Sequence, residues 1–327
     1  MSKIAKTFIS IISVVLVIAA LFLIIMLSPH NITSDKFTII STSFPGYDFA
    51  RAITANSKNT EVKMLLPPGT DLHSFEPTPQ DIKTIINSDI FIYVGGDSDS
   101  WTNNILSLIN PDKTCIIKLI DLVPTVEESL IEGMESNEED ENADKSTVSE
   151  PEYDEHVWTS IPNAITIIDK LKKEIISHDQ INSDLYQKNA TEYISNLNAL
   201  DEKFKSLVES TDQHTIILGD RFPFRYFVEA YGLDYFAAFP GCSEQTEASA
   251  KTIAFLIDKI KSNHIPVVFR TELSSGKIAD AIATETNAKV LELHSAHNVS
   301  QTDFNNGITY YDIMNRNYDA LKETLSS

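Results

Sequence analysis

Short apolar runs alternate with amphipathic stretches along most of the chain. Runs rich in β-branched and aromatic residues predict eight strands, at 37–42, 62–66, 90–94, 115–119, 215–218, 235–238, 267–270 and 290–293. Helical spacing of apolar residues predicts helices between them, at 47–55, 78–87, 103–109, 223–231, 247–263 and 275–286. Alternation of this kind is typical of parallel sheets covered by helices, here four strand–helix units followed by four more.

A helical region separates the two sets of strands. Segment 163–177 has apolar residues at helical spacing, and a second helix from about Asp184 to Glu209 contains no Gly or Pro. About 26 residues would reach roughly 39 Å. We therefore predict an α/β fold with two lobes, each a four-stranded, mainly parallel sheet with flanking helices, joined by one long rigid helix. The predicted boundaries are 35–182 for the N-terminal lobe, 183–210 for the connecting helix and 211–327 for the C-terminal lobe.

Residues 1–34 have the pattern of a membrane anchor or signal segment. Lys3 and Lys6 precede an apolar stretch from Phe8 to Leu27, which is long enough to span the roughly 30 Å hydrocarbon core of a bilayer. Its length and the lack of a clear A-x-A site favour an uncleaved anchor over a cleaved signal peptide. The positive-inside rule then places the rest of the chain outside the cytoplasm. We expect a membrane-attached extracytoplasmic protein, secreted if the segment is cleaved.

The charge balance points to a cation as the ligand. The 327 residues include 47 acidic residues and 26 Lys or Arg, giving a net charge of −21, which argues against nucleic-acid binding. Segment 127–155 holds thirteen acidic residues and only Lys145 as a base, so it carries −12 of this charge. It contains few apolar residues and predicts a disordered loop, either a solvated insertion or a weak collector of cations. Cys115 and Cys242 fall in different lobes and are expected to be unpaired thiols.

Candidate metal ligands follow the predicted strands. Parallel α/β sheets bind ligands at the carboxyl ends of their strands, and the residues found there are His73, Asp220, Glu272 and His294. His156 is a further candidate, between the acidic segment and the helix at 163. Three imidazoles and one oxygen donor suit Zn²⁺ first, whereas additional carboxylates suit Mn²⁺. The role of His297 stays open between a ligand, a partner of a ligand and an exposed residue.

Two motifs resemble a known family. Segment 67–81, PPGTDLHSFEPTPQD, resembles the first metal-ligand motif of the zinc/manganese substrate-binding proteins of ABC importers. Segment 155–158, EHVW, followed by PNA at 162–164, is similar to the second motif, and 310–315 resembles the closing segment of the family. The resemblance implies that His73 and His156 bind metal. It also implies a cognate ABC permease and its ATPase as partners, and a small lobe adjustment instead of a wide hinge closure.

The third motif departs from the family pattern. Arg221 stands where family members place a His or Glu ligand, and a guanidinium has no lone pair to offer a metal. His294 takes the place of the usual carboxylate at the last strand end. Glu272, Asp220 or water could complete the shell, and Arg221 would then pair with one of these two carboxylates or bind a carbonyl.

The sequence thus favours a monomeric metal receptor that captures Zn²⁺, or Mn²⁺, in the cleft between two lobes and delivers it to a permease. No catalysis is needed for this role. The expected ligands are His73, His156 and His294, with Glu272 or Asp220. The alternatives are a receptor for a metal chelate or haem, an adhesin and, least favoured, a zinc hydrolase with Glu272 as its general base.

Overall fold

The computed structural model describes residues 36–71, 75–128, 130–134, 153–243 and 247–325. Residues 37–327 form one compact unit, distinct from residues 1–36. Within the described ranges, no helix is both long and apolar enough to cross a membrane. The predicted anchor, Phe8–Leu27, lies outside these ranges.

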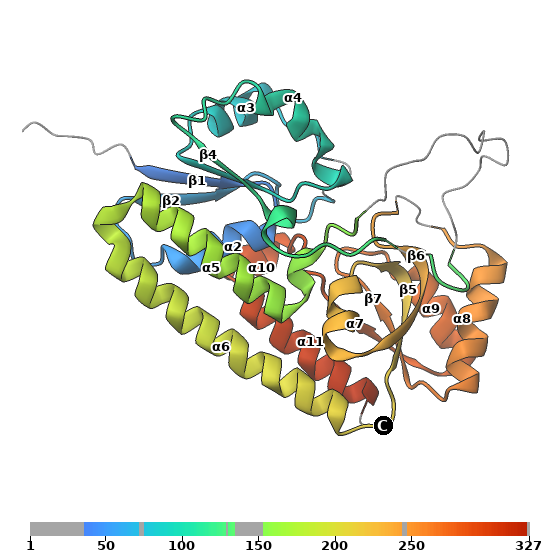
Figure 1. Ribbon diagram of the computed structural model, residues 1–327. Helices are drawn as coiled ribbons and strands as arrows, with labels where there is room; N and C mark the ends of the chain where they lie inside the picture. The colour runs from blue at the N-terminus through green and yellow to red at the C-terminus, as the bar shows by residue number, and fades with distance from the viewer. Residues whose placement is uncertain (1–35, 72–74, 129, 135–152, 244–246, 326–327) are drawn as a thin grey trace, which may run out of the picture. The chain divides into compact units, whose positions relative to one another are not determined.

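The first half of the compact unit is built on a four-stranded parallel sheet (Figure 1). The strands run in the order β2-β1-β3-β4 and comprise β1 Phe37–Ser41, β2 Thr60–Met64, β3 Ile90–Tyr93 and β4 Cys115–Lys118. Its connections contain α2 Phe44–Ile53, α3 Pro79–Ile86, the 3₁₀ helix η2 Asp97–Thr102, α4 Asn103–Leu106 and η3 Leu119–Leu122. Thr78 begins α3 with a capping box, because its hydroxyl accepts the N–H of Asp81 while the Asp81 carboxylate accepts the N–H of Thr78.

A second four-stranded parallel sheet carries the C-terminal half (Figure 1). Its order is β6-β5-β7-β8, with β5 Thr215–Phe222, β6 Asp234–Pro240, β7 Val267–Arg270 and β8 Lys289–Glu292. The helices between these strands are α7 Arg225–Tyr231, α8 Ala250–Ser262 and α9 Lys277–Thr286. All eight predicted strands are present, and both sheets are wholly parallel, which confirms the predicted fold class.

Helices that follow β4 and β8 pack beside the two sheets. They are α5 Ile161–His178, α6 Ser183–Glu209 and α11 Tyr310–Leu325, with η4 Val157–Thr159, η5 Gln180–Asn182 and α10 Gln301–Asn305 as shorter elements. The 27 residues of α6 form one uninterrupted helix, about 40 Å long at 1.5 Å per residue. Its buried face includes Leu197, Leu200 and Phe204. These residues belong to one hydrophobic core that includes side chains from both halves, so α6 acts as a packed strut.

A buried carboxylate fastens three of these helices together. Asp48 of α2 accepts hydrogen bonds from the Tyr193 hydroxyl of α6 and the Tyr310 N–H of α11, each at 2.8 Å. Arg51 pairs with the same carboxylate at 2.5 Å and donates to the main-chain oxygen of Ile308. Asp48 is 1% exposed. The contacts therefore fix α2, α6 and α11 relative to one another.

The acidic segment is ordered at both ends, which corrects the expectation of a disordered loop over all of 127–155. Glu127 and Tyr153 form an isolated antiparallel bridge, and the Glu128 carboxylate accepts the N–H of Cys242. Asp154 and Glu155 are buried, and hydrogen-bond donors close to both carboxylates offset the cost of burying them. The centre of the segment, 135–152, lies outside the described residues.

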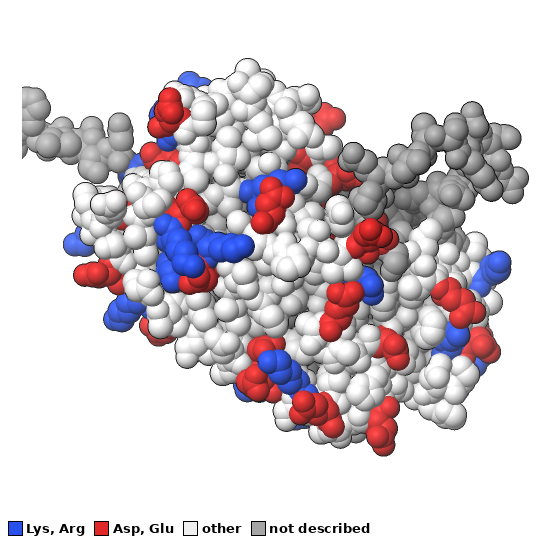
Figure 2. Space-filling view, in the orientation of Figure 1, with Lys and Arg blue, Asp and Glu red and all other residues white. Residues whose placement is uncertain are grey.

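Many charged side chains outside the acidic segment are paired. On the face drawn in Figure 2, Lys and Arg side chains lie close to Asp and Glu. Lys172 and Lys173 pair with Asp169, for example, and Lys205 pairs with Asp201. Both cysteines are free thiols, as expected from their positions in different lobes.

Candidate metal centre

His156 is a buried imidazole whose tautomer is fixed by a neighbouring carboxylate. It stands at the N-cap of η4 and is 1% exposed. Its Nδ1 lies 3.0 Å from Asp154 Oδ1, which also accepts the His156 main-chain N–H. A carboxylate accepts hydrogen bonds, so Nδ1 carries the proton and Nε2 keeps its lone pair. This carboxylate–imidazole arrangement is typical of metal-binding histidines.

Acidic groups around His156 favour positive charge at this point. Burial lowers the pKa of His156, but Asp154, Glu155 and Glu128 outweigh that effect, and the pKa is raised overall. Burial in turn raises the pKa of Glu155 to about 7, although its contact with the Ser98 hydroxyl opposes the shift. The surroundings of His156 are therefore suited to a cation, whether a proton or a metal ion.

His297, from the C-terminal half, lies beside His156. The two ring centroids are 5.2 Å apart and the rings are perpendicular. The Trp158 ring lies beside both imidazoles, with its centroid 5.6 Å from that of His156 and 5.4 Å from that of His297. Its indole N–H donates to the Ser295 carbonyl. The three rings thus join η4 to the loop after β8.

The conformation of the loop after β8 explains why His297 lines the cleft. Ala296 has a φ of 61°, a left-handed conformation that costs an L-residue about 1–2 kcal/mol. The Asn298 amide donates to the carbonyls of Pro67 and Thr70, at 2.9 and 2.6 Å, and the Gly69 N–H donates to Val299. These bonds hold the Pro-Gly turn of the N-terminal half against the loop that carries His297. His73, which follows this turn, lies outside the described residues.

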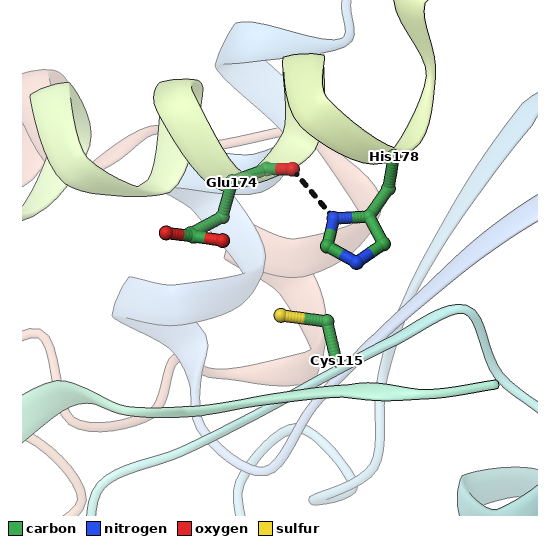
Figure 3. A group of neighbouring side chains, drawn as sticks. All are labelled: Cys115, Glu174 and His178. Atoms are coloured by element: carbon green, nitrogen blue, oxygen red, sulfur yellow. Dashed lines mark hydrogen bonds between the residues drawn. The ribbon is translucent and has the colours of Figure 1, made fainter. Parts of the chain in front are cut away.

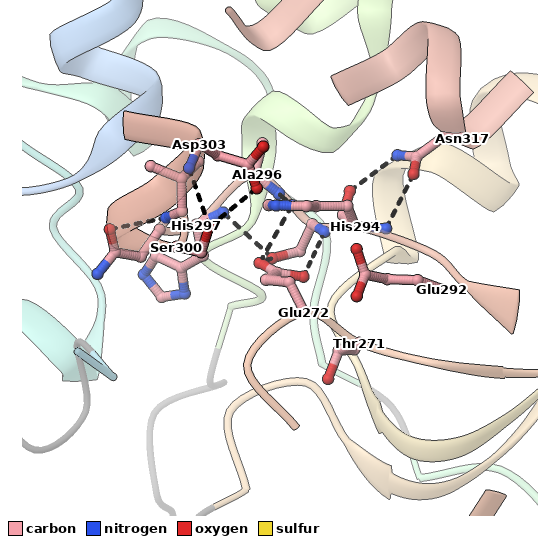
Figure 4. Close-up of polar contacts among 12 residues, drawn as sticks. Thr271, Glu272, Glu292, His294, Ala296, His297, Ser300, Asp303 and Asn317 are labelled. Carbon is pink, nitrogen blue, oxygen red and sulfur yellow. Dashed lines mark hydrogen bonds and ion pairs between the residues drawn. The ribbon is translucent and has the colours of Figure 1, made fainter. Parts of the chain in front are cut away.

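His294 is placed differently from His297. Its Nδ1 accepts the Ala296 main-chain N–H at 2.9 Å, and its main-chain N–H and C=O are both bonded to the Asn317 amide (Figure 4). A neutral imidazole that accepts at Nδ1 carries its proton on Nε2, so neither nitrogen has a spare lone pair. The structure therefore places His294 in a turn next to Glu272, 3.6 Å from Nδ1 to Oε1, and brings His297 to His156 instead.

The two candidate carboxylates both line the cleft, and each accepts hydrogen bonds from a neighbouring loop or strand end. Glu272 accepts the N–H of Ser295 at 2.7 Å and its hydroxyl at 2.5 Å (Figure 4). Asp220 sits in the irregular part of β5, where it accepts the N–H and hydroxyl of Thr271. Both carboxylates are already oriented by these bonds, and each would have to exchange a hydrogen bond for a metal bond.

Arg221 crosses the cleft to the N-terminal half. Its Nη1 lies 3.1 Å from Asp71 Oδ2, two residues before His73. This ion pair corrects the expectation that the guanidinium would pair with Glu272 or Asp220, because its partner is Asp71 on the opposite side of the cleft. The cleft has a volume of about 490 Å³, and its ionisable lining consists of Asp71, Asp220, Arg221, Glu247, Glu272, Lys277 and His297.

His297 and Asn298 are the site residues whose roles the sequence left unassigned. Two histidines three residues apart after one strand, at 294 and 297, give no indication of which one faces the cleft. That choice depends on the left-handed turn at Ala296, a conformation that alanine seldom adopts. An Asn directly after a His was the available signal, because Asn side chains commonly bond to loop carbonyls.

Two parallel-sheet lobes, one long connecting helix and a cleft lined by His297, with the buried His156 beside it, are the features of two-lobed metal-binding receptors. The chain belongs to the family described as zinc-uptake complex component A, periplasmic, whose sequence pattern matches residues 39–324. This confirms the resemblance carried by the motifs at 67–81 and 155–164.

Individual relatives agree with the family. The high-affinity zinc uptake system protein ZnuA of Bacillus subtilis is 28% identical over 316 residues, which cover 94% of this chain and 96% of the relative. The zinc-binding lipoprotein AdcA of Streptococcus pneumoniae serotype 4 is 27% identical, and the match covers 94% of this chain but only 59% of AdcA. Among solved structures, the metal-dependent lipoprotein YcdH from Bacillus subtilis has a TM-score of 0.71 and 28% identity, covering 89% of this chain and all of that one.

Proposed function

We propose that the protein is an extracytoplasmic substrate-binding protein that captures Zn²⁺ between its lobes and delivers it to a cognate ABC permease with its ATPase. Mn²⁺ is the second candidate ion. The protein would act as a monomer, and the role includes no catalytic step. Family membership supports the transport role, and the relatives named for zinc support the choice of ion.

The observation that carries the proposal is the pairing of His156 with His297. The two imidazoles come from different halves of the molecule, and their centroids are 5.2 Å apart. Zn²⁺ binds imidazole nitrogen at about 2.0–2.1 Å, so tetrahedral ligands lie about 3.3 Å from each other. A small rotation of the half-buried His297 ring would bring one nitrogen of each histidine to that separation. A nitrogen-rich shell favours zinc over manganese.

The proposed shell contains His73, His156 and His297, completed by one oxygen donor. His73 is included because its motif resembles the first ligand motif of the family, and because Asp71, two residues earlier, lines the same cleft as His297. His297 replaces His294, whose Nδ1 accepts the Ala296 N–H and whose Nε2 then carries the ring proton. Glu272 is the preferred oxygen donor, with Asp220 or water as alternatives, because Glu272 lies on the strand end nearest the His297 loop and bonds to it through Ser295.

Zinc titration of two cleft variants tests this shell. Arg221→Ala is expected to keep a tight 1:1 site, because a guanidinium donates no lone pair. Glu272→Gln should weaken Zn²⁺ binding by at least about 10-fold, because the amide keeps an oxygen atom but loses the negative charge of the carboxylate. Competition with a chelating dye measures both, and Asp220→Asn is the matched comparison that tells the two carboxylates apart. Loss of the tight site in Arg221→Ala alone would contradict the proposed shell.

A metal chelate is the second candidate ligand, because the cleft of about 490 Å³ is larger than a bare ion needs and contains Arg221. The pairing of Arg221 with Asp71 offsets the positive charge that an anionic chelate would require. Tight binding of Zn²⁺ alone in the titration above would exclude an obligatory chelate.

We further propose that Phe8–Leu27 stays on the protein as a membrane anchor. The stretch is long enough to span a bilayer, and no Cys at 20–28 could carry a lipid. Mass spectrometry of protein from membrane fractions should therefore find the intact N-terminus. A mature N-terminus near residue 28, with the protein in the soluble fraction, would show a cleaved signal segment.

A further inference from the structure

A second group of metal-type donors lies away from the cleft. Cys115 opens β4, and Glu174 and His178 lie one turn apart at the end of α5 (Figure 3). One donor atom from each side chain falls within 4.8 Å of the other two, and in the described part of the chain no other trio of His, Cys, Asp or Glu does so. Cys115 is the first residue of its strand, whereas the cleft lies at the carboxyl ends of the strands. The trio therefore lies at the opposite end of the strands of the N-terminal sheet.

We propose that Cys115, Glu174 and His178 form a second metal site, for a borderline d-block divalent cation with Zn²⁺ first. One sulfur, one nitrogen and one oxygen donor are the three ligand types that zinc accepts from proteins. Three protein ligands leave a fourth position for water. Thiolate and carboxylate together supply two negative charges, which neutralise a divalent ion.

The hydrogen bonding of His178 is compatible with a ligand role. Its Nδ1 lies 2.9 Å from the main-chain oxygen of Glu174 (Figure 3). A carbonyl oxygen only accepts, so Nδ1 carries the proton and Nε2 keeps the lone pair. A backbone carbonyl that orients a histidine in this way is a common support for metal ligands. The position at the carboxyl end of α5 adds to this, because the helix dipole favours cations there.

The cluster needs only a short contraction to bind. Ligand atoms around tetrahedral zinc are about 3.3–3.6 Å apart, compared with the 4.8 Å limit within which these three lie. Glu174 and His178 are exposed and can move, whereas Cys115 is held in the sheet by its pairing with Ile90. A thiol must also lose its proton to bind a metal ion. We therefore expect weaker and more readily exchanged binding than in the cleft.

Co²⁺ is the probe that separates this site from the cleft. A Co²⁺–thiolate bond gives a near-ultraviolet charge-transfer absorption that nitrogen and oxygen ligands do not give. Titrating Co²⁺ into the metal-stripped full chain in detergent should produce this band, and Zn²⁺ should remove it. The band should be absent in Cys115→Ser and unchanged in Cys242→Ser, the matched control with the other cysteine.

Substitutions of the two exposed ligands show whether a lost signal reflects lost metal binding or a misfolded protein. His178→Gln and Glu174→Gln change exposed side chains and should each raise the Co²⁺ concentration at half-maximal absorption at least about tenfold. No thiolate band in the wild type at saturating Co²⁺, or a band that persists in Cys115→Ser, would overturn the proposal. An unchanged midpoint in both His178→Gln and Glu174→Gln would also overturn it. None of these outcomes depends on the cleft, whose proposed ligands include no sulfur.

Discussion

Replacing His156 or His297 with alanine should weaken Zn²⁺ binding by more than about 100-fold. Changes to groups that merely support a ligand cost 10–100-fold, and each of these variants removes a proposed ligand from one half of the molecule. His294→Gln should cost less than about tenfold, because Nδ1 of His294 accepts the Ala296 N–H and Nε2 then carries the ring proton. Competition with a chelating dye gives the affinities directly.

Thermal unfolding supplies an independent readout for the same variants. A ligand that binds only the folded state stabilises it by RT ln(1 + [L]/Kd), about 4.1 kcal/mol at 1,000 times Kd. His156→Ala and His297→Ala should therefore lose most of the zinc-induced rise in melting temperature, whereas His294→Gln should keep it. If His294→Gln binds as weakly as His156→Ala while His297→Ala binds like the wild type, then His294 is the ligand and the assignment made here is wrong.

Asp48→Ala is expected to lower the free energy of unfolding by about 3–5 kcal/mol, the cost of breaking a buried ion pair by removing one partner. The substitution leaves Arg51 without its carboxylate and takes an acceptor from Tyr193 and Tyr310, in the middle of three packed helices. Urea unfolding of the metal-free protein measures the change.

Two controls define the Asp48 result. Asp258→Ala removes an exposed carboxylate from α8 and should change stability by no more than about 0.5 kcal/mol. Asp48→Asn keeps an acceptor of the same shape and should lie between wild type and Asp48→Ala. A loss below about 1 kcal/mol for Asp48→Ala would mean that α2, α6 and α11 are held by apolar packing alone.

The fold could be predicted largely because its strands are short, apolar and separated by helices with clear periodicity. Val267–Arg270 was predicted to the residue, and most other strand ends differ by one or two. The exception is β5, which continues through Asp220 and Arg221 to Phe222 after a register shift. Gly219-Asp220 looks like the start of a turn, and only the pairing of Arg221 with Phe239 in β6 extends the strand.

The site was predicted less completely than the fold. His156 stands in a recognisable motif, and its aspartate partner is only two residues away, so local sequence carries most of the information. His297 depends on contacts between residues more than 130 positions apart, including the Trp158 bond to Ser295 and the Asn298 bonds to Pro67 and Thr70. Its orientation cannot be read from the sequence around it.

The contacts of the turn at 67–71 bear on how an ion enters or leaves the cleft. The turn is held by the two Asn298 bonds, by the bond from the Gly69 N–H to Val299 and by the pairing of Asp71 with Arg221. Three hydrogen bonds at about 0.5–1.5 kcal/mol net each make detachment cost about 1.5–4.5 kcal/mol, so the turn would be detached less than about a tenth of the time. Separating α2, α6 and α11 costs more, because it breaks the Asp48 contacts, worth about 3–5 kcal/mol by themselves, and the apolar packing around them. Local fraying of one turn, instead of parting of the two halves, is thus the cheaper path for an ion to enter or leave.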